Sequence, residues 1–205
     1  MKLFRIVVVA SMLMVGVCSG GVAVAATPSS PAALPATPLP VDSVLQVDGR
    51  FVTQDGRAFA LAERRGRPQL VTMFYTSCPY MCPLLIDAAK GIDHALTADE
   101  RAKLPVLLVS FDSVRDTPEA LQAQATKRKL DTPRWTLATT DAATVRKLAG
   151  VLDIRYRALA DGGFNHTGVL VLLDADGRIL ARTEAVGAVP DPVFLKAVRQ
   201  AIAER

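Results

Sequence analysis

The sequence lacks a large excess of charge of either sign, and it has few cysteines and histidines. Its 24 Lys and Arg stand against 20 Asp and Glu, which gives a formal net charge of +4. A surplus this small provides no basic patch of the kind that binds nucleic acid, so we expect no nucleic-acid partner. Hydrophobic residues make up 50% of the chain, which argues against disorder and suffices for the core of one domain.

The first 25 residues have the three parts of an export signal. Lys2 and Arg5 are followed by the apolar stretch 6–17 and by Ala23-Val24-Ala25, a small-x-small cleavage motif. The uncharged stretch 6–26 also has the length of a membrane anchor, since about 20 apolar residues span a bilayer. We therefore expect an exported protein, either periplasmic or anchored in the inner membrane and facing the periplasm, with no other membrane contact.

Residues 26–43 are rich in Pro, Ala and Ser and are interpreted as a linker. Residues 44–205 are predicted to form the folded domain, and we expect it to be a monomer. Asp48-Gly49 and Asp55-Gly56 separate short stretches and predict an N-terminal β-hairpin extension.

After this extension, strands alternate with helices. Buried strands are predicted at 70–75 and 106–111, helices at 79–96 and after the capping residues Thr117, Asp141 and Asp191, and a hairpin at 168–174 and 178–183. This order is typical of a thioredoxin-like α/β fold, with a central mixed sheet flanked by helices.

The mature domain has one cysteine pair, Cys78 and Cys82, because Cys18 belongs to the export segment. A disulfide across four residues closes too small a loop to stabilise a domain of this size, so the pair needs a chemical explanation. It lies where a buried strand is predicted to turn into a helix, and the amides of a helix start stabilise a thiolate, above all on Cys78. If the first turn is helical, both sulfurs lie on one face and can chelate a soft metal or form a disulfide.

Two histidines are available as further ligands. His94 is predicted to share the helix with Cys82, and twelve residues of helix separate them by about 18 Å at about 1.5 Å per residue. We interpret it as a polar residue near the helix end. His166 follows the Gly162-Gly163 loop and is predicted to open the strand at 168–173, beside the cysteines in a thioredoxin-like arrangement. Two thiolates and an imidazole suit Cu(I) or Cu(II), whereas structural zinc normally has a fourth protein ligand.

These segments together resemble the Sco/SenC family. The resemblance runs from about residue 44 to the C-terminus, and its motifs are Cys78-Pro79-Tyr80-Met81-Cys82-Pro83, the stretch 109–118 (VSFDSVRDTP), Asn165-His166-Thr167 and the stretch 173–178 (LDADGR). The joint match is specific, although a CxxxC pair alone would not be. One departure is Ser113-Val114, where the family commonly has Pro-Glu; this affects the loop and leaves the ligands untouched.

The resemblance implies that Cys78, Cys82 and His166 are copper ligands. It also implies a chaperone that delivers copper to the dinuclear copper centre of cytochrome c oxidase, or reduces the cysteines of that centre. The partner would be the subunit that holds this centre, or another copper or thiol protein. Asp112 falls at an acidic position of the family and either tunes the site or is a polar strand end. Arg115 and its neighbours are interpreted as loop and helix cap.

Two alternative functions remain. Cys78 could attack and Cys82 resolve in a thiol–disulfide oxidoreductase or thiol peroxidase. The CxxxC spacing and the absence of a proline around Asn165-His166-Thr167 count against this alternative, because thioredoxin-type enzymes use CxxC with a proline opposite the cysteines. A copper or redox sensor without a delivery function is also compatible with the sequence.

Overall fold

The computed structural model describes residues 37–204. The predicted export segment and most of the predicted linker lie outside the described residues, so the division of the chain at 25 and 43 stays a prediction. Residues 38–205 form one compact unit. Within the part that is described, no helix combines the length and the apolar character needed to cross a membrane.

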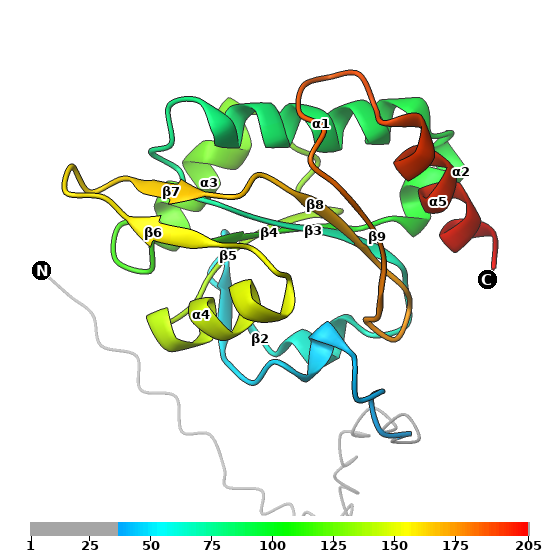
Figure 1. The fold of residues 1–205 in the computed structure, drawn as a ribbon, viewed down its shortest axis with the longest axis horizontal. Helices are drawn as coiled ribbons and strands as arrows, with labels where there is room; N and C mark the ends of the chain where they lie inside the picture. Colours follow the sequence, from blue (N-terminus) through cyan, green and yellow to red (C-terminus); the bar gives the residue numbers. More distant parts are fainter. Residues whose placement is uncertain (1–36, 205) are drawn as a thin grey trace, which may run out of the picture. The chain divides into compact units, whose positions relative to one another are not determined.

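A seven-stranded mixed sheet lies at the centre of the unit (Figure 1). Its strand order is β2-β1-β5-β4-β3-β8-β9. The strands are β1 (Phe51–Thr53), β2 (Ala58–Phe59), β3 (Gln69–Phe74), β4 (Val106–Ser110), β5 (Trp135–Thr139), β8 (Leu170–Leu173) and β9 (Ile179–Thr183). β3, β4 and β5 are parallel, and the other pairs are antiparallel. Every residue of β3, β4 and β8 is buried, as expected for strands covered on both faces.

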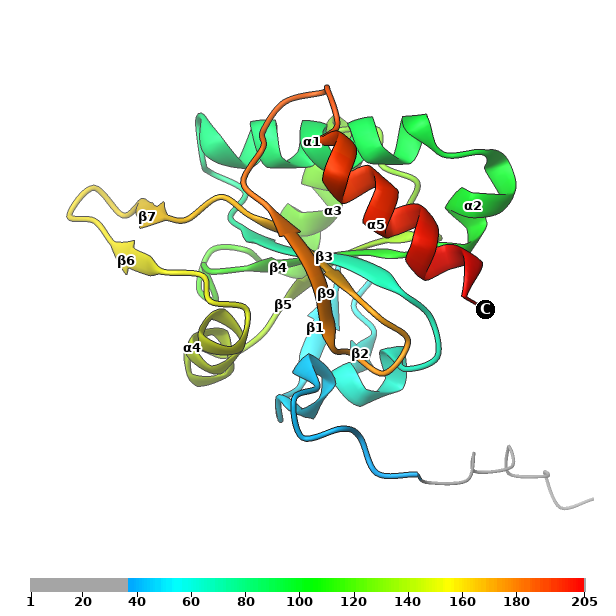
Figure 2. The ribbon, with the colours of Figure 1, turned by 45° about the vertical axis from the view of Figure 1, so that its right-hand side comes forward.

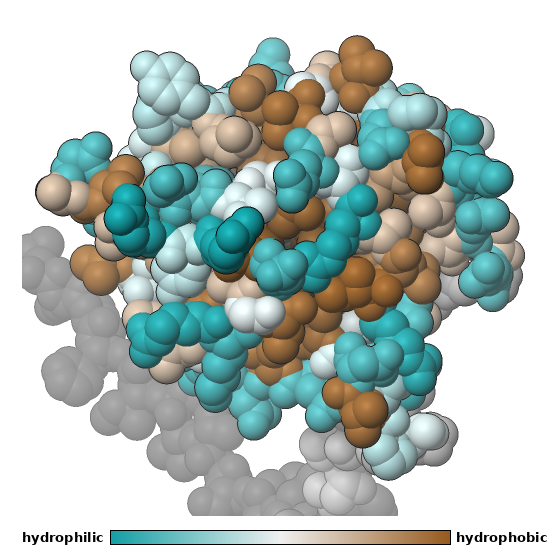
Figure 3. Space-filling model, viewed as in Figure 1, coloured by the Kyte–Doolittle hydropathy of each residue, from teal (hydrophilic) through white to brown (hydrophobic). Residues whose placement is uncertain are grey.

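Helices cover both faces of this sheet. They are α1 (Met81–Ala95), α2 (Ala98–Lys103), α3 (Pro118–Lys127), α4 (Ala142–Val151) and α5 (Pro192–Ala203). α1, α3 and α5 lie on one face and α4 on the other (Figures 1 and 2). On the side seen in Figure 3, hydrophobic side chains show below the centre and near the upper edge, with hydrophilic side chains between and around them. The predicted class, a mixed sheet flanked by helices, is confirmed.

The N-terminal hairpin forms, but its neighbours differ from the prediction. β1 pairs with β2 and also with β5, so the hairpin extends the central sheet. Residues 44–46, at the start of the predicted hairpin extension, form the 3-10 helix η1 (Val44–Gln46) instead, because the Ser43 hydroxyl accepts from the Leu45 N–H and caps the turn. The second difference is η2 (Leu61–Arg64), which follows β2.

A separate two-stranded ribbon, β6 (Tyr156–Ala158) and β7 (Phe164–His166), extends from the central sheet (Figures 1 and 2). The sequence prediction missed it, along with β5 and α2. Each strand of the ribbon has three residues, too short for an alternating pattern to be recognised. His166 is the last residue of β7, and β8 begins at Leu170. The prediction that His166 opens the strand at 168–173 is therefore wrong.

Candidate metal centre

The two cysteines lie on either side of the start of α1. The predicted helix start at Pro79 is wrong: α1 begins at Met81, after Tyr80, whose φ of −127° and ψ of −64° are not helical. Cys78 is consequently in the loop that joins β3 to α1. The Cys82 N–H donates to the Cys78 sulfur at 3.3 Å. The thiol of Cys78 thus satisfies an open amide of the helix start, as a capping oxygen does elsewhere.

Cys82 is fixed within the core. Its side chain is 1% exposed, and its sulfur accepts a hydrogen bond from the Tyr75 N–H at 3.4 Å. Both cysteines are free thiols. The outer sulfur, Cys78, is half-buried and the inner one is enclosed, so reagents in solvent meet Cys78 first.

His166 reaches the cysteines from the ribbon. In the β6–β7 register it stands opposite Tyr156, and its ring packs against Phe111 at 5.0 Å and Tyr75 at 6.0 Å between ring centroids. Its Nδ1 lies 3.1 Å from the Thr167 carbonyl oxygen, which can only accept a hydrogen bond. The hydrogen of a neutral ring is therefore on Nδ1, and the lone pair on Nε2 faces the Cys82 sulfur at 3.6 Å.

The three predicted ligand residues come together in one place. The ligand atoms of Cys78, Cys82 and His166 all lie within 4.8 Å of one another, so the group could hold a metal ion. A cleft of about 590 Å³ opens beside it, lined by the cysteine loop, Arg115 and the ribbon that carries His166. Two soft sulfur donors and one neutral nitrogen donor fit a copper ion.

The protein environment shifts the pKa values of the two thiols in opposite directions. Burial raises the pKa of Cys78, but hydrogen bonds from the Cys82 backbone and thiol, the Tyr80 backbone and the Tyr75 hydroxyl outweigh it, and the net pKa is lowered. Burial raises the pKa of Cys82 strongly, and the neighbouring Cys78 and Asp116 add to the rise. Burial also lowers the pKa of His166, and the hydrogen bond to the Thr167 carbonyl raises it by less. The lowered pKa keeps the imidazole neutral and able to bind metal.

From this difference we expect iodoacetamide to modify Cys78 well before Cys82 at neutral pH. The thiolate is the nucleophile, and a lower pKa gives Cys78 more of it. Peptide mass spectrometry on unit 38–205, sampled at intervals, measures the order. Denatured protein is the control, in which the two rates should converge. Equal rates in the native protein, or faster modification of Cys82, would contradict the assignment.

The remaining sequence candidates lie elsewhere or act indirectly. His94 is exposed near the C-terminal end of α1 and is absent from the metal-binding group found among residues 37–204. Asp112 is buried and pairs with Arg115, so it contacts the loop after β4 rather than the three ligand atoms. The sequence analysis interpreted Asp116 only as part of a loop and helix cap and gave no role to the aromatic rings around His166, because their contacts at the site join segments that are far apart in the chain.

Comparisons with known proteins show which family model and which relatives the chain is similar to. The SCO1/SenC family model matches residues 42–201. A protein of Stutzerimonas stutzeri described as copper-binding is 23% identical over 139 residues, which are 66% of this chain and 67% of that protein.

Two solved structures show a shared fold. Bradyrhizobium japonicum ScoI with copper bound has a TM-score of 0.63 at 21% identity, covering 75% of this chain and 96% of that one. BsSco is described as a member of the Sco family of cytochrome c oxidase assembly proteins, with a disulfide switch. Its TM-score is 0.65 at 19% identity, covering 78% of this chain and 94% of that one. The predicted thioredoxin-like fold is confirmed.

Proposed function

The chain belongs to the SCO1/SenC family, and we propose that it binds one copper ion through Cys78, Cys82 and His166 and passes it to a partner protein. The observation that carries this proposal is the convergence of the three ligand atoms within 4.8 Å. The ion is the cargo of such a protein. A site of two sulfurs and one nitrogen beside an open cleft leaves room for a ligand of the partner to enter.

We further propose that the recipient is the dinuclear copper centre of cytochrome c oxidase. Support comes from the family and from the description of BsSco as an oxidase assembly protein. Delivery to this centre requires a domain outside the cytoplasm, which fits the export signal or anchor proposed for residues 1–25 and the linker proposed for 26–43. The recipient, the location and a monomeric state belong to this proposal.

The difference in pKa and in burial between Cys78 and Cys82 favours a second candidate function, thiol–disulfide exchange. An outer thiol of lowered pKa and an inner thiol of raised pKa have the properties of an attacking and a resolving cysteine. His166 beside the Cys82 sulfur can accept the thiol proton in that reaction, so its position is compatible with both functions. We place copper binding first because it uses all three side chains together, as ligands of one ion.

We test the proposed function with His166→Ala in the reduced unit 38–205. The wild type should bind one Cu(I), and the variant should bind it roughly 10- to 100-fold more weakly, because two thiolates remain but the nitrogen donor is lost. Competition with a Cu(I) chelator of known affinity measures the change.

His94→Ala is the matched control, because it removes the other histidine at an exposed place on α1 and should leave the affinity unchanged. If the wild-type domain bound no copper, the proposed function would be wrong. An His166→Ala variant with full affinity would remove His166 from the ligand set.

A further inference from the structure

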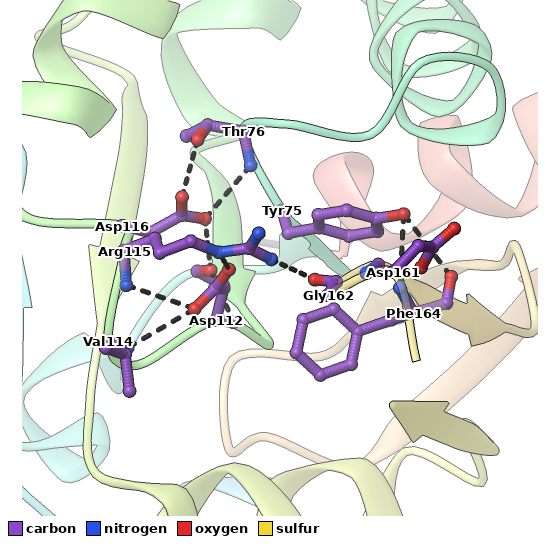
Figure 4. Close-up of polar contacts among 11 residues, drawn as sticks. Tyr75, Thr76, Asp112, Val114, Arg115, Asp116, Asp161, Gly162 and Phe164 are labelled. Carbon is purple, nitrogen blue, oxygen red and sulfur yellow. Dashed lines mark hydrogen bonds and ion pairs between the residues drawn. The ribbon is translucent and has the colours of Figure 1, made fainter. Parts of the chain in front are cut away.

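The loop between β4 and α3 contacts both segments that carry the proposed copper ligands. Its residues Asp112, Arg115 and Asp116 lie between the cysteine loop and the β6–β7 ribbon (Figure 4). Asp116 forms hydrogen bonds to the cysteine loop, Arg115 forms one to the ribbon, and an ion pair joins Arg115 to Asp112 within the loop itself.

Asp116 fixes the cysteine loop. Its side chain is 1% exposed, and it accepts hydrogen bonds from the Thr76 N–H at 3.0 Å, from the Thr76 hydroxyl and from the Ser110 hydroxyl. Thr76 stands two residues before Cys78, and Ser110 ends β4. The end of β4 and the start of the cysteine loop are therefore tied to one buried carboxylate.

Asp112 fixes Arg115. Its buried carboxylate accepts from the Arg115 N–H at 3.0 Å and from the Val114 N–H at 3.4 Å, and it pairs with the Arg115 guanidinium through Nε. A guanidinium bound at Nε still presents its Nη groups in a fixed plane. The contacts with Asp112 thus fix the direction in which the Nη groups of Arg115 extend from the loop.

The outer end of Arg115 reaches the turn of the ribbon. Nη2 donates to the Gly162 carbonyl oxygen, as Figure 4 shows. Gly162 has a φ of +80°, and a Cβ built there would stand 3.1 Å from Arg115 Nη1, so a side chain at this position would be strained and would press on the guanidinium. Four residues later the same ribbon carries His166.

We propose that Arg115 is a positioning residue for His166: by joining Asp112 to Gly162 it holds the β6–β7 ribbon in place, so that the imidazole stays within reach of both sulfurs. The inference rests on the proposed copper function. Other side chains also help to hold the ribbon. The Tyr75 hydroxyl accepts from the Phe164 N–H at 3.3 Å and donates to the Phe164 carbonyl oxygen at 3.4 Å, and the Phe111 ring packs against ribbon residues, His166 included. Arg115 is half-exposed, which keeps its expected effect moderate.

A double-mutant cycle tests this role. Arg115→Ala should weaken Cu(I) binding by reduced unit 38–205 about fivefold, and Arg115→Ala with His166→Ala should bind no more weakly than His166→Ala alone, because the arginine acts through the histidine. Arg115→Lys should resemble Arg115→Ala, since one ammonium keeps the charge but cannot make both contacts in the same geometry. Arg157→Ala is the control: its exposed side chain on β6 has no ion pair or hydrogen bond with residues 37–204, and the affinity should not change.

Two other readouts separate positioning from loss of fold. The Cu(II) form of Arg115→Ala should give a weaker nitrogen signal from histidine in electron paramagnetic resonance. In the metal-free protein, amides of residues 156–166 should exchange hydrogen faster, while those of β3 and β4 keep their protection. Losses that add in the double mutant, or an unchanged exchange rate in the ribbon, would overturn the proposal. If the wild type binds no copper, the proposed function fails, and the exchange experiment decides on its own whether Arg115 holds the ribbon.

Discussion

Replacing Cys82 by serine is expected to weaken Cu(I) binding by the reduced domain roughly 100- to 1000-fold, a larger loss than that expected for His166→Ala. A thiolate is a strong soft ligand, whereas a serine hydroxyl is a hard and neutral one. The remaining pair, Cys78 and His166, supplies one sulfur and one nitrogen, which is too few for tight binding. Cys78→Ser should have an effect of the same size, for the same reason.

The structure indicates that this loss is not caused by unfolding. Cys82 is enclosed in the core, but its sulfur accepts from the Tyr75 N–H, and a serine oxygen can accept the same hydrogen bond. Circular dichroism and thermal unfolding of the metal-free variants should therefore remain close to the wild type. The same reasoning predicts that removing copper leaves the wild type folded, in contrast with structural metal sites.

Chelator competition measures the affinity, with Ser77→Ala as a control from the same loop. That residue lines the cleft but is absent from the group that could hold a metal ion. A serine variant of either cysteine that held copper as tightly as the wild type would show that the cysteine pair is not the site.

The ligand residues could be selected from the sequence because a soft metal ion binds few residue types, and the sequence has few residues of those types. Residues 26–205 contain two cysteines and two histidines, and helix geometry separated His94 from Cys82. The helix start itself was misplaced, since Pro79 and Tyr80 are compatible with a first turn, and the choice between turn and loop depends on hydrogen bonds that the sequence does not display. Cys78 lies in the loop and accepts from the Cys82 N–H.

What holds the ligand segments could not be predicted. Within residues 37–204, β6 and β7 are short strands that pair only with each other, so no long apolar pattern marks them. Asp116 and Arg115 stand in a stretch that has the pattern of a loop and a helix cap, and Thr117 does cap α3. Their second role depends on contacts with Thr76 and Gly162, which are 40 and 47 residues away in the chain.

The second large effect expected is that oxidation of Cys78 and Cys82 to a disulfide abolishes tight copper binding. Two thiols lose two protons and two electrons to the added oxidant, diamide, and the sulfurs become bonded at about 2.05 Å. Their lone pairs then belong to a neutral disulfide, which is a much weaker ligand than two thiolates. The two sulfurs already lie within 4.8 Å of each other, and Cys78 is in a loop, so the bond needs only local movement.

The measurement is a Cu(I) titration of matched oxidised and reduced samples of unit 38–205. We expect the oxidised sample to bind at least about 100-fold more weakly, in line with the loss of a thiolate ligand, and treatment with a phosphine reductant to restore the affinity. Cys82→Ser is the control, because it cannot form this bond and its weak binding should not respond to diamide. Equal affinity in both wild-type samples would mean that the metal and the disulfide use different sulfurs. Cys78 is the more accessible of the two thiols and has the lowered pKa. A partner whose thiol attacks the Cys78–Cys82 disulfide, or whose own disulfide is attacked by the Cys78 thiolate, would therefore control copper loading through the same atom that binds the ion.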